Sequence, residues 1–522
     1  GRIVAVGSDA EMWALRGEAT VVIEAGGRTL LPGFFESHMH LFGGAELQHL
    51  QLTGLRGMAA VKAAFAAFAA ANPDAPVLMA EGVDYGILGH AMTRLDLDAV
   101  LADRPIALRA MDHHTVWANT ACLRQAGLLH GAVMPAGHEV VMGADGLASG
   151  ELREFEAFDA VLTLAGVSRM YVGIARGLDP AGPVSAADRE VDKGHIARGM
   201  RHCAASGCTS LVTMDGNPYT LGLLAEMEAE GRLLQRVKVP FHFKPEMALA
   251  DLDLASQMAS AQTDWVRSGF VKMFMDGVVD SRTAYMTEDY PGTTTRGTSL
   301  FEAGRFKEIC AEIDRRGLQI AVHCVGDGAV RVTIDGYEAA GQANGLRDMR
   351  HRIEHIELIT RPDIPRLRSL GITASLQPPH APGAMDFPLE AMTAVFHAAR
   401  WRDAYLWRTL RDAGARVAFA SDWPVSDVAV MRGIQAQMTR VPFVGAEDER
   451  LSLMDTLYAY TAGGAWAAHM EGLTGQLVPG LAADIVLIDG DIEAIAAQDL
   501  GQTGIAMTIS GGRITHRNDR FA

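Results

Sequence analysis

Residues 32–40, PGFFESHMH, decide the fold, because an apolar strand there ends in two histidines, His38 and His40. Successive side chains of a strand point to opposite faces, so residues two apart share a face. Two imidazoles on one face at the carboxyl end of a strand can bind one metal ion. A single His-x-His pair is a weak signal in a chain with 18 histidines, so further ligands have to come from elsewhere in the sequence.

The rest of the chain predicts the surroundings of this strand. Short β-branched or aromatic runs alternate with helical stretches such as 303–316 and 401–414. This alternation is typical of βα units around a parallel sheet. We therefore predict an α/β fold in which residues 31–474 form a (β/α)8 TIM-like barrel. The predicted barrel strands are 29–35, 209–213, 237–243, 270–274, 319–323, 352–355, 372–376 and 416–420.

Two parts of the chain fall outside the barrel pattern. The gap between the first two strands, about 53–191, is too long for one helix and has its own strand signals at 77–80 and 105–111. We interpret it as a large inserted subdomain that supplies the substrate pocket. Both ends also carry strand signals with Gly-Gly and Asp-Gly turns. The simplest arrangement is a small β-sandwich domain formed by residues 1–30 and 475–522.

The composition limits the function classes. The balance of 46 Lys+Arg against 63 Asp+Glu gives a net charge of −17, which argues against nucleic acid or an anionic membrane as partner. No apolar run reaches the roughly 20 residues of a membrane helix. The five cysteines form no Cys-x-x-Cys pair, so a reducing, cytoplasmic location is expected. The chain opens without Met, which leaves a removed leader or missing first strands open.

Further metal-ligand candidates stand at the ends of later predicted strands. His323 ends LQIAVH, His355 ends HRIEH, and Asp422 follows ARVAFAS. The carboxyl ends of barrel strands form the face that carries barrel active sites. Four histidines and one aspartate in register with strand ends therefore predict a metal site rather than a set of unrelated core residues.

Lys272 lies inside an apolar strand, in SGFVKMFMDG at 268–277. A buried lysine is costly unless its charge is removed or paired. Carboxylation by CO2 would convert it to a carbamate that can bridge two cations, and the cations would stabilise the carbamate in return. The alternative is an ordinary lysine that snorkels or pairs with Asp276, and Asp276 could itself be a ligand.

With these residues the chain resembles the amidohydrolase superfamily, and within it the YtcJ-like subfamily that includes N-substituted formamide deformylase. The resemblance spans nearly the whole chain. The matching stretches are GRTLLPGFFESHMHL, DHHTVWANTACLRQAG, GLASGELREFEA, GFVKMFMDGVVDSRTA, AVHCVGDGAV, RIEHIE, FASDWPV and GLTGQLVPGLAADIVLID. Their order and spacing are specific to that group.

The resemblance implies a binuclear centre with two divalent metal ions per chain, most simply Zn2+. Manganese, iron, cobalt or nickel could occupy the same ligands. The implied ligands are His38 and His40 for the more buried ion, N-carboxylated Lys272 as the bridge, His323 and His355 for the more exposed ion, and Asp422 as a ligand or near neighbour. Asp422 is also implied to act as the catalytic general base and acid.

We therefore predict a metal-dependent hydrolase of a non-peptide C–N bond in a small-molecule amide, N-formyl or N-acyl amine. A bound zinc ion lowers the pKa of water to about 7, so a metal-activated hydroxide can attack a carbonyl at neutral pH. The same site could hydrolyse an ester or lactone, open a cyclic imide, or deaminate a heterocycle. A non-catalytic relative would be expected to have lost ligands, whereas all six positions are filled. A homodimer is the default oligomer.

A second set of residues is predicted to contact substrate. His114 and Glu154, with Asn119, lie in the insert and could line the pocket or serve the structure alone. Arg282, with Thr283, follows the Lys272 strand in a loop that could bind a polar substrate group. Trp423 could wall the pocket or simply pack.

Three further residues near strand ends have less support. His242 ends the predicted third strand and is a weaker ligand candidate. Asp327 could orient a ligand imidazole, although a helix cap is the favoured reading, and Cys324 is expected to pack.

Overall fold

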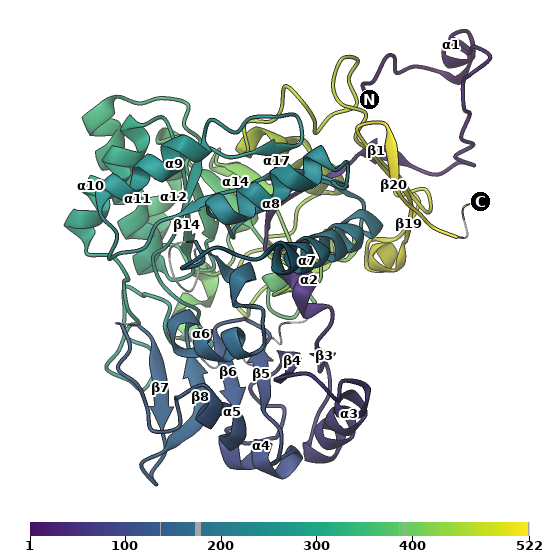
Figure 1. The fold of residues 1–522 in the computed structure, drawn as a ribbon. Helices are drawn as coiled ribbons and strands as arrows, with labels where there is room; N and C mark the ends of the chain where they lie inside the picture. Colours follow the sequence, from purple (N-terminus) through teal and green to yellow (C-terminus); the bar gives the residue numbers. More distant parts are fainter. Residues whose placement is uncertain are drawn as a thin grey trace.

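The computed structural model describes residues 1–135, 137–172, 179–385, 387, 389, 393, 395, 397–519 and 521. Figure 1 shows three parts: a central body of parallel strands and helices, an insert below it, and a small sheet formed by the two ends of the chain. The predicted α/β class is confirmed. Among the described residues, no helix combines the length and the apolar character that crossing a membrane requires.

The central body contains two parallel sheets whose strands follow one another along the chain. The first has the order β12 (Val266–Arg267), β10 (Arg236–Lys238), β9 (Cys208–Thr213), β2 (Phe34–Met39). The second has the order β11 (Phe241–His242), β13 (Phe270–Phe274), β14 (Gln319–Cys324), β15 (Arg352–His355), β16 (Thr373–Leu376), β17 (Arg416–Phe419).

The two sheets share chain segments and a hydrogen-bonded seam. Pro240, which has no N–H to donate, separates β10 from β11, so one segment pairs in both sheets. At the other edge, the Asp422 N–H donates to the His38 carbonyl at 3.0 Å, and the His40 N–H donates to the Trp423 carbonyl at 2.7 Å. Backbone hydrogen bonds therefore join β2 to the segment after β17.

Helices cover the outside of these strands because each buries one apolar face. In α10 (Ala303–Arg315) the buried residues Phe306, Ile309, Cys310 and Ile313 recur at three- and four-residue spacing. The other helices of the body are α2 (Gly43–Glu46), α7 (Ala186–Ala205), α8 (Pro218–Ala229), α9 (Leu252–Met258), α11 (Asp327–Asn344), α12 (Ile364–Ser369), α14 (Trp407–Asp412), α15 (Val430–Thr439), α16 (Leu453–Ala459) and α17 (Ala462–Ala467).

The predicted strands match the observed ones closely except for the first and the third, 237–243, which is divided into β10 and β11. The predicted strand 29–35 is divided between β1 (Leu30–Pro32), which belongs to the terminal sheet, and β2, which starts at Phe34. Gly33 lies between them, and a Cβ at this position would approach the Thr209 side chain to 2.2 Å. Only glycine allows β2 to begin this close to β9, so the chain changes sheet here.

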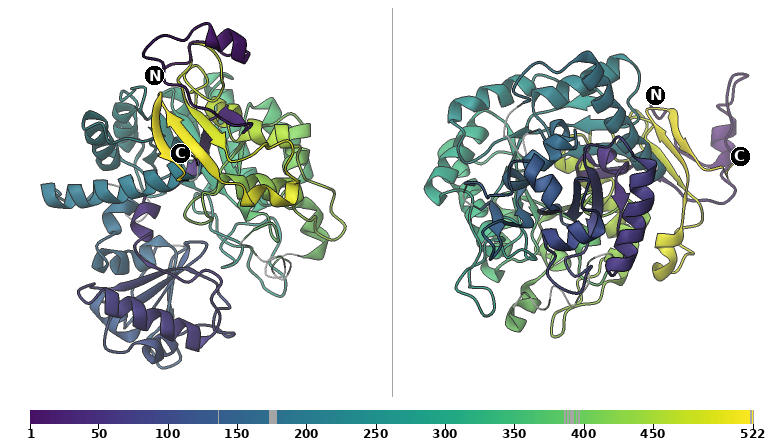
Figure 2. Two further views of the ribbon diagram at one scale, coloured as in Figure 1. Left: turned by 90° about the vertical axis from the view of Figure 1, so that its right-hand side faces the viewer. Right: turned by 60° about the horizontal axis from the view of Figure 1, so that its bottom comes forward.

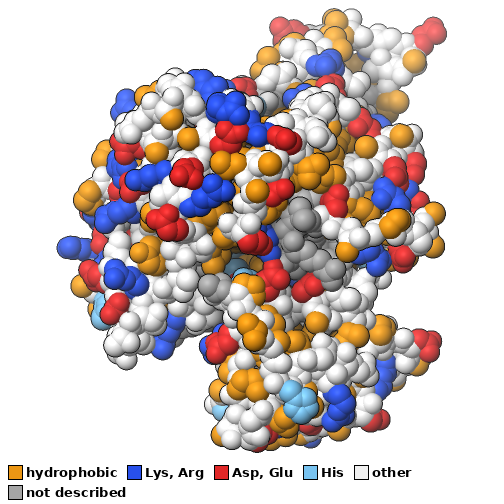
Figure 3. All heavy atoms as spheres, turned by 60° about the vertical axis from the view of Figure 1, so that its left-hand side comes forward, with side chains coloured by type: hydrophobic (Ala, Val, Ile, Leu, Met, Phe, Trp, Pro, Cys, Tyr) orange, Lys and Arg blue, Asp and Glu red, His pale blue; other side chains and the backbone are white. Residues whose placement is uncertain are grey.

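The insert contains a mixed sheet with the order β3-β4-β5-β6-β8-β7. Its predicted strands at 77–80 and 105–111 correspond to β4 (Leu78–Val83) and β5 (Ile106–Ala110). The remaining elements are β3 (Leu50–Gln51), α3 (Met58–Ala71), α4 (Arg94–Val100), β6 (Thr115–Ala118), α5 (Thr120–Gln125), β7 (Glu139–Met142), β8 (Ala148–Arg153), α6 (Phe155–Leu164) and the 3-10 turn η1 (Ser168–Tyr171). The surface is hollowed where the insert meets the body (Figure 3).

The two ends of the chain form one antiparallel sheet, with the order β1, β18 (Ile485–Ile488), β19 (Ile505–Ser510), β20 (Arg513–Arg517). A sandwich of two sheets was predicted, and the described residues do not form its second layer. Residues 3–29 contain the helix α1 (Asp9–Trp13) but no strand, and they leave the body as an extended arm (Figure 2). Val4 and Val21 are each 84% exposed, because no facing sheet covers them.

Candidate metal centre

The six predicted metal ligands line one cavity at the carboxyl ends of the body strands. His38 lies in β2 and His40 directly after it, Lys272 lies in β13, His323 in β14, His355 ends β15, and Asp422 follows β17. All six side chains are buried, the most exposed being His40 at 7%. The parallel strands therefore bring together residues that are spread over most of the sequence.

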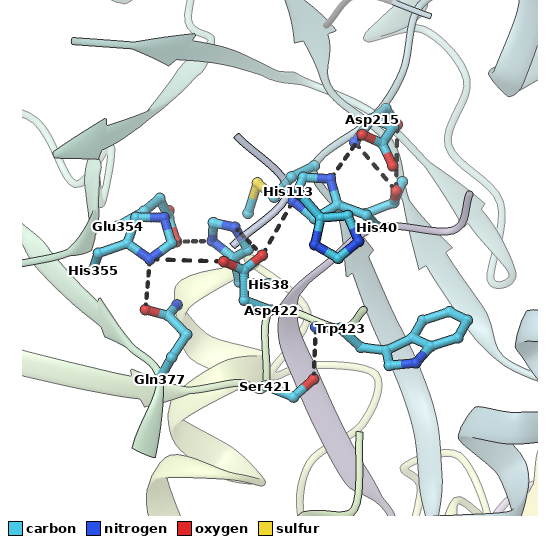
Figure 4. Close-up of polar contacts among 12 residues, drawn as sticks. His38, His40, His113, Asp215, Glu354, His355, Gln377, Ser421, Asp422 and Trp423 are labelled. Atoms are coloured by element: carbon cyan, nitrogen blue, oxygen red, sulfur yellow. Dashed lines mark hydrogen bonds and ion pairs between the residues drawn. The ribbon is translucent and has the colours of Figure 1, made fainter. Parts of the chain in front are cut away.

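Asp422 is the centre of this group (Figure 4). Its Oδ1 atom lies 3.2 Å from His38 Nε2 and 3.1 Å from His40 Nε2, and its Oδ2 atom lies 3.9 Å from His355 Nδ1. Donor atoms of His38, His355 and Asp422 all lie within 4.8 Å of one another, a spacing suited to one metal ion. Asp422 has a φ of 60°, a conformation that non-glycine residues rarely adopt and that is concentrated at functional sites.

Buried acceptors outside this group orient its imidazoles. His38 Nδ1 lies 2.7 Å from Glu354 Oε2, and His40 Nδ1 lies 2.7 Å from Asp215 Oδ1. These contacts turn the Nε2 atoms of both rings toward Asp422, as metal-binding histidines are commonly held. The sequence pattern did not indicate Asp215 or Glu354, although each lies at or just after the end of a predicted strand.

The β15 strand departs from the usual alternation of side chains. Glu354 and His355 are adjacent, and a regular strand would send them to opposite faces. His355 has a φ of 76°, so both side chains reach the centre. His355 Nδ1 also lies 2.9 Å from Gln377 Oε1, a second partner that the sequence did not indicate.

Lys272 is fully buried, and its Nζ atom has no hydrogen-bond partner among the described residues. Burial lowers the pKa of Lys272 to about 8. The alternative pairing with Asp276 does not form, because the Asp276 oxygens accept the backbone N–H groups of Tyr285, Val325 and Gly326 at 2.8–3.0 Å. Both carboxylate oxygens of Asp276 are therefore used to hold the backbone of these neighbouring loops.

The charges of the group favour a cation. Burial alone would raise the pKa of Asp422, but the imidazoles of His38 and His40 hold it well below its ordinary value. Burial opposes a charge on His40, yet the carboxylates of Asp215 and Asp422 raise its pKa to about 9. Asp422 Oδ1 has no contact of hydrogen-bond geometry among the residues that the structure describes. The converging nitrogen and oxygen donors therefore fit zinc or a similar divalent ion.

The structure places two of the predicted substrate residues, His114 and Glu154, beside this cavity. His114 lines it, with its ring centroid 5.7 Å from that of His323. Glu154 Oε2 lies 2.7 Å from His114 Nδ1, and Glu154 Oε1 accepts the Thr283 hydroxyl at 3.1 Å. Asn119 is structural instead, because its side chain caps α5 by accepting the Cys122 N–H.

Arg282 and Trp423 are not brought to the cavity. Arg282 is exposed in a turn with a φ of 59° and is absent from the cavity lining. The Trp423 ring points away from the centre (Figure 4). It fills a space that two glycines leave open, since a Cβ at Gly43 or Gly199 would lie 2.8 or 3.3 Å from the indole. The Trp423 ring thus packs against these two glycines.

The remaining candidates have structural partners. His242 Nε2 lies 2.5 Å from the Met214 carbonyl, and burial lowers the pKa of His242 to about 3. Asp327 accepts the backbone N–H and the hydroxyl of Thr287 and pairs with Arg400, so it does not orient His323. Cys324 is buried, with its Sγ atom 3.1 Å from the Thr333 hydroxyl.

His380 was missed by the sequence analysis. It ends the short 3-10 turn η4 (Pro378–His380) and stacks on His355, with ring centroids 6.0 Å apart and planes at 7°. It lines the same cavity as the ligand candidates. Its place just after a predicted strand is the signal that could have identified it.

The fold and the site together define an α/β protein with a buried set of donors for divalent cations. The sequence matches the amidohydrolase family over residues 21–516, so the chain belongs to that family, as the motifs led us to expect.

Three relatives match most of the chain. The chain is 27% identical to Protein LONG AFTER FAR-RED 3 of Arabidopsis thaliana, over 98% of this chain and 87% of that protein. It is 27% identical to the putative amidohydrolase YtcJ of Bacillus subtilis, over 95% and 90%. It is 23% identical to the N-substituted formamide deformylase of Arthrobacter pascens, over 98% and 93%.

Solved structures show the same fold. An uncharacterized metal-dependent hydrolase from Pyrococcus horikoshii OT3 has a TM-score of 0.73 and 22% identity, over 95% of this chain and 93% of that one. The zinc complex of atrazine chlorohydrolase TrzN from Arthrobacter aurescens TC1 has a TM-score of 0.52 and 15% identity, over 99% and 89%. At these identities the likeness concerns the fold alone.

Proposed function

We propose that the protein is a metal-dependent hydrolase that cleaves a non-peptide C–N bond in a small-molecule amide, N-formyl or N-acyl amine. The observation that carries the proposal is the meeting of six buried ligand candidates in one cavity, with Asp422 between the imidazoles. The name of one relative, N-substituted formamide deformylase, supports the choice of a C–N bond.

The metal would be held by His38, His40, Lys272, His323, His355 and Asp422, most simply as two Zn2+ ions. N-carboxylation of Lys272 would give a role to its buried Nζ atom, which has no hydrogen-bond partner among the described residues, and would supply oxygen ligands. When bound, such ions lower the pKa of a water molecule and polarise a substrate carbonyl.

The chain's own residues would then move protons and orient groups. Asp422, held ionised by its two imidazole neighbours, would accept a proton from the attacking water and deliver it to the leaving nitrogen. Glu354 and Asp215 would keep the rings of His38 and His40 in place. His114, held by Glu154, would contact the substrate from the insert. Arg282 and Trp423 have no part in this proposal.

The proposed architecture is a single eight-stranded barrel. The two parallel sheets share a segment at Pro240, and hydrogen bonds join β2 to the residues after β17, which is the pattern of a closed sheet. In this interpretation residues 31–474 form the barrel, and the insert after β2 covers its carboxyl face.

The test of the reaction class is a mass-spectrometric hydrolysis screen of the zinc-supplemented protein. The panel contains N-formyl amines, N-acyl amines, hydantoins, lactones and aminated heterocycles, and metal-stripped protein is the control. We expect metal-dependent turnover confined to one amide class. Turnover of lactones or heterocycles alone would overturn the assignment of the bond, and turnover by stripped protein would overturn the metal dependence.

Lys272→Ala tests the bridging role. We expect this variant to bind fewer metal ions per chain and to lose at least about 100-fold in kcat. Because the truncation leaves space for a small carboxylate, propionate should restore part of the activity. Lys238→Ala, which removes another buried lysine on a neighbouring part of the sheet, is the matched control. Full metal content and activity in Lys272→Ala would exclude the bridge.

A further inference from the structure

The cavity lining includes three groups that the proposed reaction does not use. Asp280 lies in the turn after β13, and Glu357 follows β15 by two residues. His380 lies at the end of η4, after β16. We call Asp280, Glu357 and His380 the acceptor wall; all three line the same cavity as the ligand candidates.

No described lysine, arginine or histidine forms an ion pair with Asp280 or Glu357. Among the described lining residues, Lys272 is the single lysine or arginine, and it belongs to the proposed metal centre. Glu357 accepts the hydroxyl of Tyr405. Asp280 has no hydrogen bond or ion pair from another described side chain, and it is half-buried. By contrast, the nearby Asp112 accepts the His114 N–H at 2.9 Å and the Tyr85 hydroxyl at 3.0 Å.

His380 provides an independent sign that a ligand is missing from this wall. Its side chain is 6% exposed, and its Nε2 atom has no hydrogen-bond partner among the described residues. The Ser421 carbonyl accepts a hydrogen bond from the ring, which must come from the other nitrogen. The neutral ring therefore presents the lone pair of Nε2, and a buried acceptor of this kind requires a donor.

Asp280 also lies close enough to the carboxylate of Asp112 for the two charges to repel each other. Burial, and then the charge of Asp112, raises the pKa of Asp280 to about 7. A positive charge between such groups removes the repulsion and satisfies the acceptors at once.

We propose that the acceptor wall binds a positively charged, N–H-bearing group of the substrate, such as an ammonium or a guanidinium. Two carboxylates and an imidazole lone pair are all acceptors, so the complementary ligand is a cation with several donors. A substrate with a free carboxylate would meet like charge at the same wall. The reaction at the other end of the substrate rests on the proposed hydrolase function, whereas the binding of the cation does not.

The kinetic test uses matched substrates. N-formyl and N-acetyl derivatives of diaminoalkanes are compared with isosteres in which a hydroxyl or a carboxylate replaces the free ammonium. We expect kcat/KM to favour the ammonium over the hydroxyl compound by at least about 10-fold, with the carboxylate compound lowest. Asp280→Asn should bring the ammonium-to-hydroxyl ratio close to one. Asp289→Asn, at an exposed position nearby, should leave the ratio as in the wild type.

A binding test separates this inference from the proposed reaction. Phenethylammonium and phenethyl alcohol are titrated by calorimetry into the metal-loaded wild type, Asp280→Asn and Glu357→Gln. We expect the ammonium to bind the wild type at least about 10-fold more tightly than either variant, with an affinity that falls as salt rises. Equal affinity for all three proteins, or cleavage of neutral amides without any preference for ammonium, would overturn the acceptor wall. Ammonium binding without any hydrolysis would instead overturn the proposed reaction.

Discussion

The pKa of Asp422 is set by neighbours that are far away in the sequence. Its carboxylate is buried, and the rings of His38 and His40, almost 400 positions earlier, hold its pKa well below the ordinary value. A carboxylate kept ionised in this way can accept a proton. A water molecule bound by the neighbouring ligand candidates would lie close enough to donate it. The left-handed backbone at Asp422 turns its side chain into the centre while the next residue, Trp423, points away.

We predict that Asp422→Asn lowers kcat by about 100-fold to 10,000-fold, because an amide can neither accept nor return the proton. Activity is measured together with the metal content per chain, so that loss of metal is distinguished from loss of the base. Asp427→Asn is the control, since Asp427 pairs with His202 at 3.0 Å outside the cavity. Unchanged hydrolysis by Asp422→Asn would remove Asp422 from the mechanism.

At the scale of elements, a buried ionic network joins the insert to the body. Arg109 of β5 contacts Glu46 of α2 at 2.7 Å and Glu81 of β4 at 3.1 Å, and it also bonds the Tyr171 hydroxyl. His113, which lines the cavity, bonds the other Glu46 oxygen at 2.8 Å. Glu46, Glu81 and His113 are spaced like metal ligands, but the Arg109 guanidinium already supplies the positive charge between the carboxylates.

We predict that Arg109→Met lowers the free energy of unfolding by about 3–5 kcal/mol, because it leaves buried carboxylates without their cation. Urea denaturation followed by circular dichroism measures the change. Arg153→Met, which removes a surface arginine paired with Glu139 and Glu151, should cost less than about 1 kcal/mol. Equal small losses in both variants would show that the network does not hold the insert.

For the whole molecule, one buried lysine links stability to pH. Lys238 of β10 is 4% exposed, and its Nζ atom lies 3.1 Å from Gln319 Oε1 and 3.0 Å from the Ala468 carbonyl. Burial lowers the pKa of Lys238 to about 7 in the folded protein. The unfolded chain keeps the ordinary value near 10.4, so between these two values the unfolded state binds more protons. Stability from this group therefore rises with pH across that window.

We predict that Lys238→Met removes this part of the pH dependence. Between about pH 7 and about pH 10 the wild type should gain stability from this group, whereas the variant should not. The free energy of unfolding of the variant minus that of the wild type should therefore decrease steadily across this range. Urea midpoints at several pH values measure the difference, in which the other titrating groups largely cancel. A difference that stays constant with pH would mean that Lys238 is charged in the folded state.

The sequence by itself determined the order of the strands and the residues at their ends. The predicted strands of the body correspond to β9, β13, β15 and β17 nearly where they were expected, because short runs rich in β-branched and aromatic residues favour strands. The six ligand candidates could be named because parallel strands place their carboxyl ends on one face. All six line one cavity in the structure.

Only the tertiary structure decided which side chains meet across the molecule. Glu354 and His38 are 316 positions apart, and no local pattern indicates that their side chains lie 2.7 Å from each other. Trp423 packs where Gly43 and Gly199 leave space for its ring. Residues 3–29 form no strand, and no facing sheet among the described residues pairs with them. Helix and strand propensities depend on residues that are neighbours in the chain. Contacts between distant elements depend instead on how their surfaces pack, and these contacts form only when the whole chain folds.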